Sequence, residues 1–115
     1  MSEQLERWKN DVGPGWLPLI EVLDKKLTML DPNYRIVQIK EKFGGLRYYI
    51  RISEGCTNSY CMYAIINTIE SLSFRICEDC GCPGEERGEE SKGEWIRTLC
   101  DECEVENKAR KTFID

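Results

Sequence analysis

Two cysteine pairs in the C-terminal third are the residues best suited to chemistry. Two residues separate Cys77 from Cys80, and two separate Cys100 from Cys103. This spacing lets both sulfurs of a pair reach one ion from a tight turn, so two such knuckles supply the four ligands of a tetrahedral zinc site. The nineteen residues between the pairs suit a zinc ribbon. Zinc accepts four soft thiolates without redox chemistry, so we predict one structural Zn²⁺ ion.

The seven cysteines allow other interpretations. In a secreted domain they could form disulfides, but their number is odd and the first residues lack the basic, apolar pattern of a signal peptide. We therefore expect a cytoplasmic protein, in which close cysteine pairs bind metal. A thiol enzyme using Cys77 and Cys80 is an alternative, although redox dithiols do not need a second pair. We expect Cys82 to be a spectator, and Cys56 and Cys61 to be buried as small apolar residues.

A catalytic set is not evident in the chain. There is no histidine, which removes the usual general base and the usual partner of a nucleophile. Gly44-Gly45 is only a turn signal, and P-loop and dinucleotide fingerprints are missing. Four protein ligands also close a zinc coordination sphere to water and substrate. The prediction is therefore a protein that is not an enzyme.

A basic segment in the middle of the chain is the second candidate site. Residues 34–52 hold five basic side chains and one acid, whereas residues 77–104 hold ten acids and three bases. The polar face of a hairpin in this segment could bind phosphate, RNA or an acidic protein surface. It could also be an ordinary solvated face, because outward faces of half-buried sheets are usually charged. The candidate partner-binding residues are Lys40, Lys42, Arg47, Tyr49 and Arg51.

Two amphipathic helices are expected to frame this segment. One covers residues 16–30 and ends at Asp31-Pro32, because a residue before proline avoids helical geometry. The other has its N-cap within residues 57–59 and ends near residue 73. The apolar stripes are Trp16, Ile20, Leu23, Leu27 and Leu30 in the first helix, and Met62, Ile65, Ile66, Ile69 and Leu72 in the second.

A β-hairpin is expected between the two helices. Residues 34–42 and 46–52 are rich in β-branched and aromatic types and surround the Gly44-Gly45 pair. Alternation places polar side chains on one face and apolar ones on the other, where the helices could cover them. The apolar face is predicted to hold Val37, Ile39, Leu46, Tyr48, Ile50 and Ile52.

The predicted fold class is α+β, with the order helix, β-hairpin, helix and C-terminal zinc ribbon. The predicted parts are an α+β core over residues 1–75, a ribbon over 76–104 packed on that core, and a tail over 105–115. Residues 94–99 are a plausible strand that enters the second knuckle. We expect Trp95 to pack against the knuckles, with an anchor for a partner as the alternative. The sequence contains no run of about 18 apolar residues, so it predicts no membrane-spanning helix.

Several stretches of this sequence resemble a set of small bacterial and phage-encoded zinc-ribbon proteins. The resemblance covers roughly residues 13–103. In those proteins the last metal ligand is often histidine, whereas here it is Cys103. The resemblance implies the same architecture and no established activity. Its motifs are Gly15-Trp16, Lys40-Glu41-Lys42-Phe43-Gly44-Gly45-Leu46-Arg47, Ile76-Cys77 through Cys80-Gly81, and Trp95-Ile96-Arg97-Thr98-Leu99-Cys100-Asp101-Glu102-Cys103.

These observations predict a non-catalytic zinc-binding protein that binds another protein. Small size, a closed metal site and separated charge favour this function, and a phage-like context would make it an inhibitor of a host or defence enzyme. The alternative is a nucleic-acid-binding regulator that uses the basic hairpin and the ribbon. The net charge of −5 opposes it, because nucleic-acid binding depends on neutralising phosphates.

Overall fold

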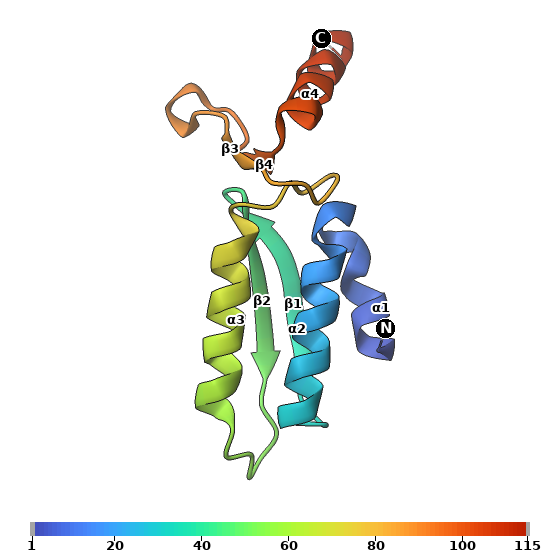
Figure 1. Cartoon of the computed structure of the whole chain (residues 1–115), viewed down its shortest axis with the longest axis vertical. Coiled ribbons are helices and arrows are strands. Elements are labelled where there is room, and N and C mark those ends of the chain that lie inside the picture. The colour runs from blue at the N-terminus through green and yellow to red at the C-terminus, as the bar shows by residue number, and fades with distance from the viewer. Residues whose placement is uncertain (1, 115) are drawn as a thin grey trace.

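A hairpin backed by helices forms the larger part of the protein, and a cysteine-rich part lies at one end of it (Figure 1). The structure is a computed structural model that describes residues 2–114, and the side chains of residues 2–109. The α+β class predicted from the sequence is confirmed. The elements in chain order are α1 (Glu3–Trp8), α2 (Leu17–Leu30), β1 (Arg35–Lys42), β2 (Gly45–Arg51), α3 (Ser59–Ser73), β3 (Glu85–Arg87), β4 (Arg97–Leu99) and α4 (Asp101–Ile114).

Helices α2 and α3 cover one face of the β1–β2 hairpin, as predicted. Most of both apolar stripes is buried or half-buried, with Trp16, Leu27 and Met62 fully enclosed. Leu72 differs, because its side chain at the end of α3 is 42% exposed. Asn58 precedes α3 as its N-cap residue, but its side chain donates to the Leu30 carbonyl at 2.8 Å and so ties the two helices together.

Helix α1 closes the outer edge of β1. The Ser2 hydroxyl caps the helix by accepting from the Leu5 N–H, and Leu5 is fully buried. The Gln4 side-chain oxygen accepts from the Ile36 N–H at 2.8 Å, and its nitrogen donates to the Tyr34 carbonyl at 3.1 Å. These bonds occupy backbone groups that an edge strand would otherwise present to another chain.

The hairpin strands pair antiparallel, with a β-bulge at Val37. Ile39 lies opposite Tyr48, and Lys40 lies opposite Arg47, but the register shifts between Ile36 and Gln38. The prediction that Val37 faces the core was therefore wrong. The extra residue turns Val37 outward, where it is 49% exposed, and Ile36 takes the inner position.

The turn of the hairpin is one residue earlier than its glycine pair suggested. Phe43 and Gly44 are the two central residues, with φ values of 52° and 81°. Positive φ at both positions defines the type I′ turn that matches the twist of hairpin strands. Gly45 is consequently the first residue of β2.

Polar contacts fix α2 and the residue after it to the hairpin. The Tyr34 hydroxyl donates to the buried carboxylate of Asp24 and lies 2.8 Å from the Tyr48 hydroxyl. Burial raises the pKa of both tyrosines. At the end of α2, the hydroxyl and N–H of Ser53 donate to the Asp31 carboxylate at 2.6 and 2.8 Å, which lowers the pKa of that carboxyl. Among the described residues, no helix has the length and apolar character needed to cross a membrane.

Candidate metal centre

The four predicted ligand cysteines meet at one point. The sulfurs of Cys77, Cys80, Cys100 and Cys103 all lie within 4.8 Å of one another, and those of Cys80 and Cys100 are 3.6 Å apart. Zinc–sulfur bonds of about 2.3 Å in a tetrahedron place the sulfurs about 3.8 Å apart. The donor set and its spacing therefore fit one tetrahedral metal ion. Cys82 is exposed and lies outside this group, as predicted.

Backbone N–H groups from both knuckles point at the buried Cys77 sulfur. Burial acts to raise the pKa of this thiol, but N–H groups of Cys100, Cys80 and Asp79 outweigh it and lower that pKa to about 7. Gly81 follows the knuckle with a φ of 84°, as the sequence suggested, and its N–H donates to the Cys77 carbonyl at 3.0 Å. These N–H groups therefore favour the thiolate form of Cys77, the form that binds a metal.

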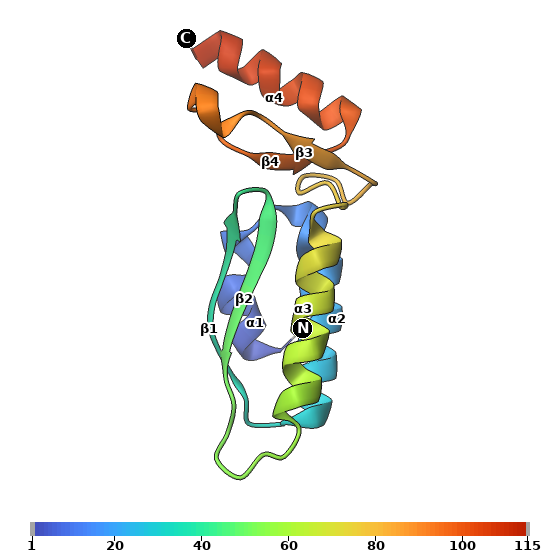
Figure 2. The ribbon, with the colours of Figure 1, turned by 90° about the vertical axis from the view of Figure 1, so that its left-hand side faces the viewer.

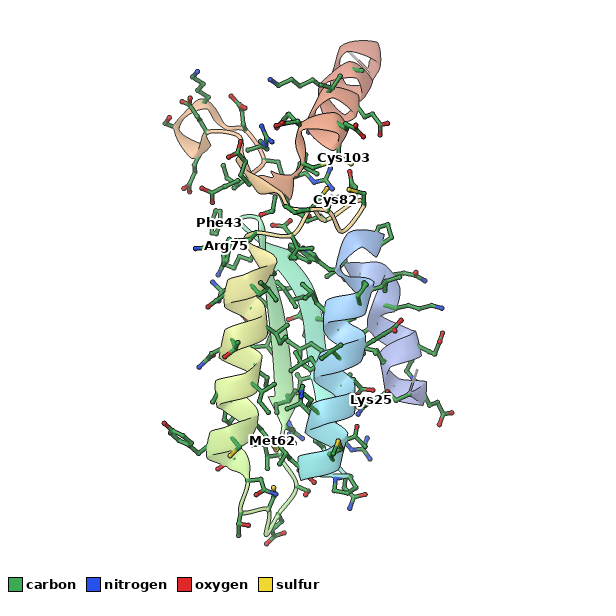
Figure 3. All side chains as sticks on the ribbon, in the orientation of Figure 1. Lys25, Phe43, Met62, Arg75, Cys82 and Cys103 are labelled. Atoms are coloured by element: carbon green, nitrogen blue, oxygen red, sulfur yellow. The ribbon has the colours of Figure 1, made fainter. Side chains whose placement is uncertain are left out.

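The second knuckle is the start of a helix. Strand β4 leads into Cys100, and Cys103 lies in the first turn of α4, where its N–H donates to the Cys100 sulfur at 3.5 Å. The predicted strand within residues 94–99 is confirmed as β4, whereas its antiparallel partner β3 was not anticipated. Helix α4 begins at Asp101 and continues to Ile114, so it crosses the boundary expected at residue 105. Figure 3 shows Cys103 and Cys82 in this part of the molecule, beyond the end of the hairpin.

Two arginines of the β3–β4 hairpin tie this part together. Arg87 donates to the Leu99 carbonyl at 3.2 Å and to the Asp101 carboxylate at 2.8 Å, which links β3 to the start of α4. Arg97 donates to the Asp79 carboxylate at 2.7 Å, which links β4 to the first knuckle. The Arg97–Asp79 bond holds the two knuckles against each other, and the Arg87 bonds brace the second knuckle.

The first knuckle packs on the start of α2. The Gly15 N–H donates to the Glu78 carbonyl at 2.7 Å, and the indole N–H of Trp16 donates to the Ile76 carbonyl at 2.9 Å. Trp16 is completely buried. Sequence periodicity identified Trp16 only as the first residue of an apolar stripe. Its hydrogen bond to the residue before Cys77 adds a second role, that of joining the metal centre to the core.

The turn of the β1–β2 hairpin packs on the second strand of the metal-binding part (Figure 2). Thr98 donates its hydroxyl to the Gly44 carbonyl at 2.6 Å and its N–H to the buried Glu78 carboxylate at 2.7 Å. Burial raises the pKa of Glu78 to about 6, although the Thr98 N–H and Arg97 oppose that rise. Sequence analysis missed Glu78 and Thr98. For Thr98 the one available signal was a polar residue between Arg97 and the apolar Leu99. The strand is too short for this position to show an alternating pattern.

The basic candidate residues gather on the outer face of the hairpin, but they are not equally available. Lys40 lies with its ammonium 5.7 Å from the centre of the Tyr49 ring. The Arg47 guanidinium lies 3.9 Å from the Glu70 carboxylate of α3, within ion-pair distance. Lys42 is exposed beside the turn, and Arg51 lies opposite Arg35 at the far end of the strands.

Two other predictions about single residues were wrong. Cys61 is exposed, because it lies about 100° around α3 from the core-facing Met62. Cys56 is half-buried against the core.

Trp95 does not pack on the knuckles. The residue is 68% exposed, and its indole N–H donates to Glu41 at 2.9 Å, because the loop before β4 passes over the hairpin turn.

Comparison of the chain with family models, curated proteins and solved structures gives no significant match. The resemblance to small bacterial and phage-encoded proteins therefore stays a prediction. Function has to be inferred from the four-cysteine centre and the surfaces around it.

Proposed function

We propose that this protein is a non-catalytic binding protein with one structural zinc ion, and that its outer hairpin face binds an acidic protein surface. Four sulfurs from two knuckles support zinc as the metal. Cys77, Cys80, Cys100 and Cys103 would hold the ion, which would supply folding free energy. Because four protein ligands complete a tetrahedron, such a site stabilises the structure and offers no position to a substrate.

The uncovered basic face of the hairpin is the observation that carries the binding proposal. Helices α2 and α3 cover the opposite face of the two strands (Figure 2). Residues 34–52 carry a net charge of +4. Among the described residues, their basic side chains other than Arg47 have no acidic partner within ion-pair distance. A face with this charge attracts a carboxylate-rich surface and increases the rate of its association.

The edges of the hairpin are already occupied, which decides how a partner would dock. Gln4 bonds to the backbone of β1 at one edge. At the other, Ser73 accepts from the Leu46 N–H and Glu70 accepts from the Tyr48 N–H, both at 2.8 Å. A partner would therefore contact the side chains of the outer face and would not add a strand to the sheet.

Charge favours a protein over a nucleic acid as the partner. The metal-binding part, residues 77–104, has a net charge of −7 before any thiolate is counted. This negative potential next to the hairpin repels a polyanion that extends beyond the basic face. A compact acidic patch on a protein avoids the repulsion. Inhibition of a host or defence enzyme is the form of binding that we propose, in keeping with the small size and the resemblance to phage-encoded proteins.

Charge reversal tests the binding face. A Lys40→Glu/Arg51→Glu variant should lose a protein that the zinc-loaded wild type captures from lysate at physiological salt. Lys25→Glu/Lys26→Glu is the matched control, because it changes the net charge equally on exposed positions of α2. Capture that survives reversal of Lys40 and Arg51 would contradict the proposal. So would salt-dependent retention of RNA or DNA that disappears in the same variant.

Metal analysis tests the other half of the proposal. Native mass spectrometry should find one zinc ion per chain, and loss of the ion should be accompanied by loss of structure in the cysteine-rich part. A fully folded chain without metal would rule out the structural role of zinc.

A further inference from the structure

A small hollow lies where the loop before β4 passes over the hairpin turn. Its volume is about 240 Å³, which suits one side chain better than a drug-sized ligand. Two exposed aromatic residues, Phe43 and Trp95, line it together with Glu41, Glu90 and Glu94. Figure 3 shows Phe43 at the hairpin turn, pointing away from the body of the molecule. This hollow borders the strand face proposed above to bind an acidic surface, and Lys42 belongs to both.

Phe43 occupies a backbone conformation that its residue type disfavours. Its φ of 52° is in the left-handed region, where a two-residue hairpin turn normally has asparagine, aspartate or glycine. A bulky side chain there is a genuine outlier. The residue is 52% exposed, so burial in the core does not explain why phenylalanine is present. Such outliers occur preferentially at ligand-binding sites, and this one places an aromatic ring at the mouth of the hollow.

Glu41 fixes the relative positions of the two aromatic residues. One of its carboxylate oxygens accepts from the Gly44 N–H within the turn, at 2.9 Å. The other accepts from the Trp95 indole N–H, also at 2.9 Å. A single carboxylate therefore links the turn that carries Phe43 to the loop that carries Trp95. The exposed rings are held in place before any ligand arrives, which reduces the entropy lost on binding.

The charge around the hollow selects a cation. Glu41, Glu90 and Glu94 contribute three carboxylates, and Lys42 is the one basic side chain among the lining residues. Aromatic faces attract ammonium and guanidinium groups, and carboxylates strengthen that attraction. We propose that this hollow binds a lysine or arginine side chain of a basic peptide segment. The partner would then contact the protein at two places of opposite charge.

Peptide titration of the zinc-loaded full chain tests this site. The probes are acetyl-Gly-Arg-Gly-amide and acetyl-Gly-Lys-Gly-amide, with acetyl-Gly-Gln-Gly-amide as the neutral control. The indole N–H signal of Trp95, assigned with a Trp95→Phe variant, reports binding in ¹H–¹⁵N spectra. Both cationic peptides should shift this signal to saturation, and the glutamine peptide should leave it in place.

Phe43→Gly is the decisive variant because it removes the ring without threatening the fold. Glycine adopts positive φ without strain, so the turn should form at least as well. Loss of one cation–π contact should lower the affinity for the arginine peptide about fivefold. Glu94→Gln should also lower the affinity for this peptide. Tyr60→Ala is the control, because Tyr60 is an exposed aromatic residue at the start of α3 and should not affect the Trp95 signal.

Three outcomes would overturn the proposal. They are an equal response to the glutamine peptide, an unchanged affinity in Phe43→Gly, and a Trp95 shift on concentrating the protein alone, which would identify a second copy as the occupant. The Lys40→Glu/Arg51→Glu variant should bind the cationic peptides at least as well as the wild type. The test therefore does not depend on the outer hairpin face.

Discussion

Replacement of Gly15 by alanine tests whether the metal centre is packed on the core. A Cβ atom at this position would lie 2.1 Å from the Cys77 carbonyl oxygen and 2.6 Å from the Gly81 nitrogen. Both are backbone atoms of the first knuckle, so no flexible side chain can move away. Because Cβ atoms essentially never approach closer than 3.0 Å, the knuckle and the start of α2 must separate.

The cost follows from the contacts that this separation changes. Overpacking of a well-packed region costs about 1–3 kcal/mol. Loss of the 2.7 Å hydrogen bond from Gly15 to the Glu78 carbonyl adds about 1 kcal/mol. Alanine returns about 0.4–1 kcal/mol by restricting the unfolded chain. Together these terms amount to about 1–4 kcal/mol, and we expect the free energy of unfolding to fall by about 2 kcal/mol.

Urea unfolding followed by circular dichroism, with excess zinc present, measures this change. Gly55→Ala is the matched control, because Gly55 has a φ of 84° and no atom lies within 4 Å of the position that its Cβ would take. It should lose only the roughly 1–2 kcal/mol that a left-handed alanine costs. Chelator competition should also show weaker zinc binding in Gly15→Ala than in Gly55→Ala. A Gly15→Ala protein as stable as the wild type would refute the packing of the knuckle on α2.

Three further predictions concern the metal and a carboxylate. Cys80→Ser should abolish stoichiometric zinc binding and lower Tm, whereas Cys82→Ser, which changes another exposed thiol two residues away, should do neither. Removal of zinc with a chelator should reduce hydrogen-exchange protection in α4 before it affects α2, because the second knuckle is the first turn of α4. Asp31→Asn should lower Tm at neutral pH, and the difference from wild type should shrink as pH falls below about 4. The Ser53 contacts lower the pKa of Asp31 in the folded protein, so their stabilisation is present above the pKa of the unfolded chain and is lost when Asp31 is protonated. A difference in Tm between variant and wild type that stays constant from pH 7 to pH 3 would contradict this assignment.

Local patterns predicted the elements well, and they failed where one added residue or one loop changed the outcome. Helical spacing in residues 16–30 identified α2, because apolar residues recur every three or four positions along an amphipathic helix. The same kind of argument failed at Val37, since a bulge inserts a residue without leaving a signal in the alternation. It also failed for Trp95, whose position depends on a loop that crosses a turn more than fifty residues earlier in the chain.

The sequence by itself determined the order of α2, the β1–β2 hairpin, α3 and β4, and the identity of the four clustered cysteines. Ligand spacing in a Cys-x-x-Cys knuckle is a property of a single turn, so the chain need not be folded for it to be recognised. Only the tertiary structure decided how the centre is joined to the core. Gly15, Gly44 and Thr98 come from separate segments, and their contacts exist because helix packing and hairpin pairing bring those segments together at once.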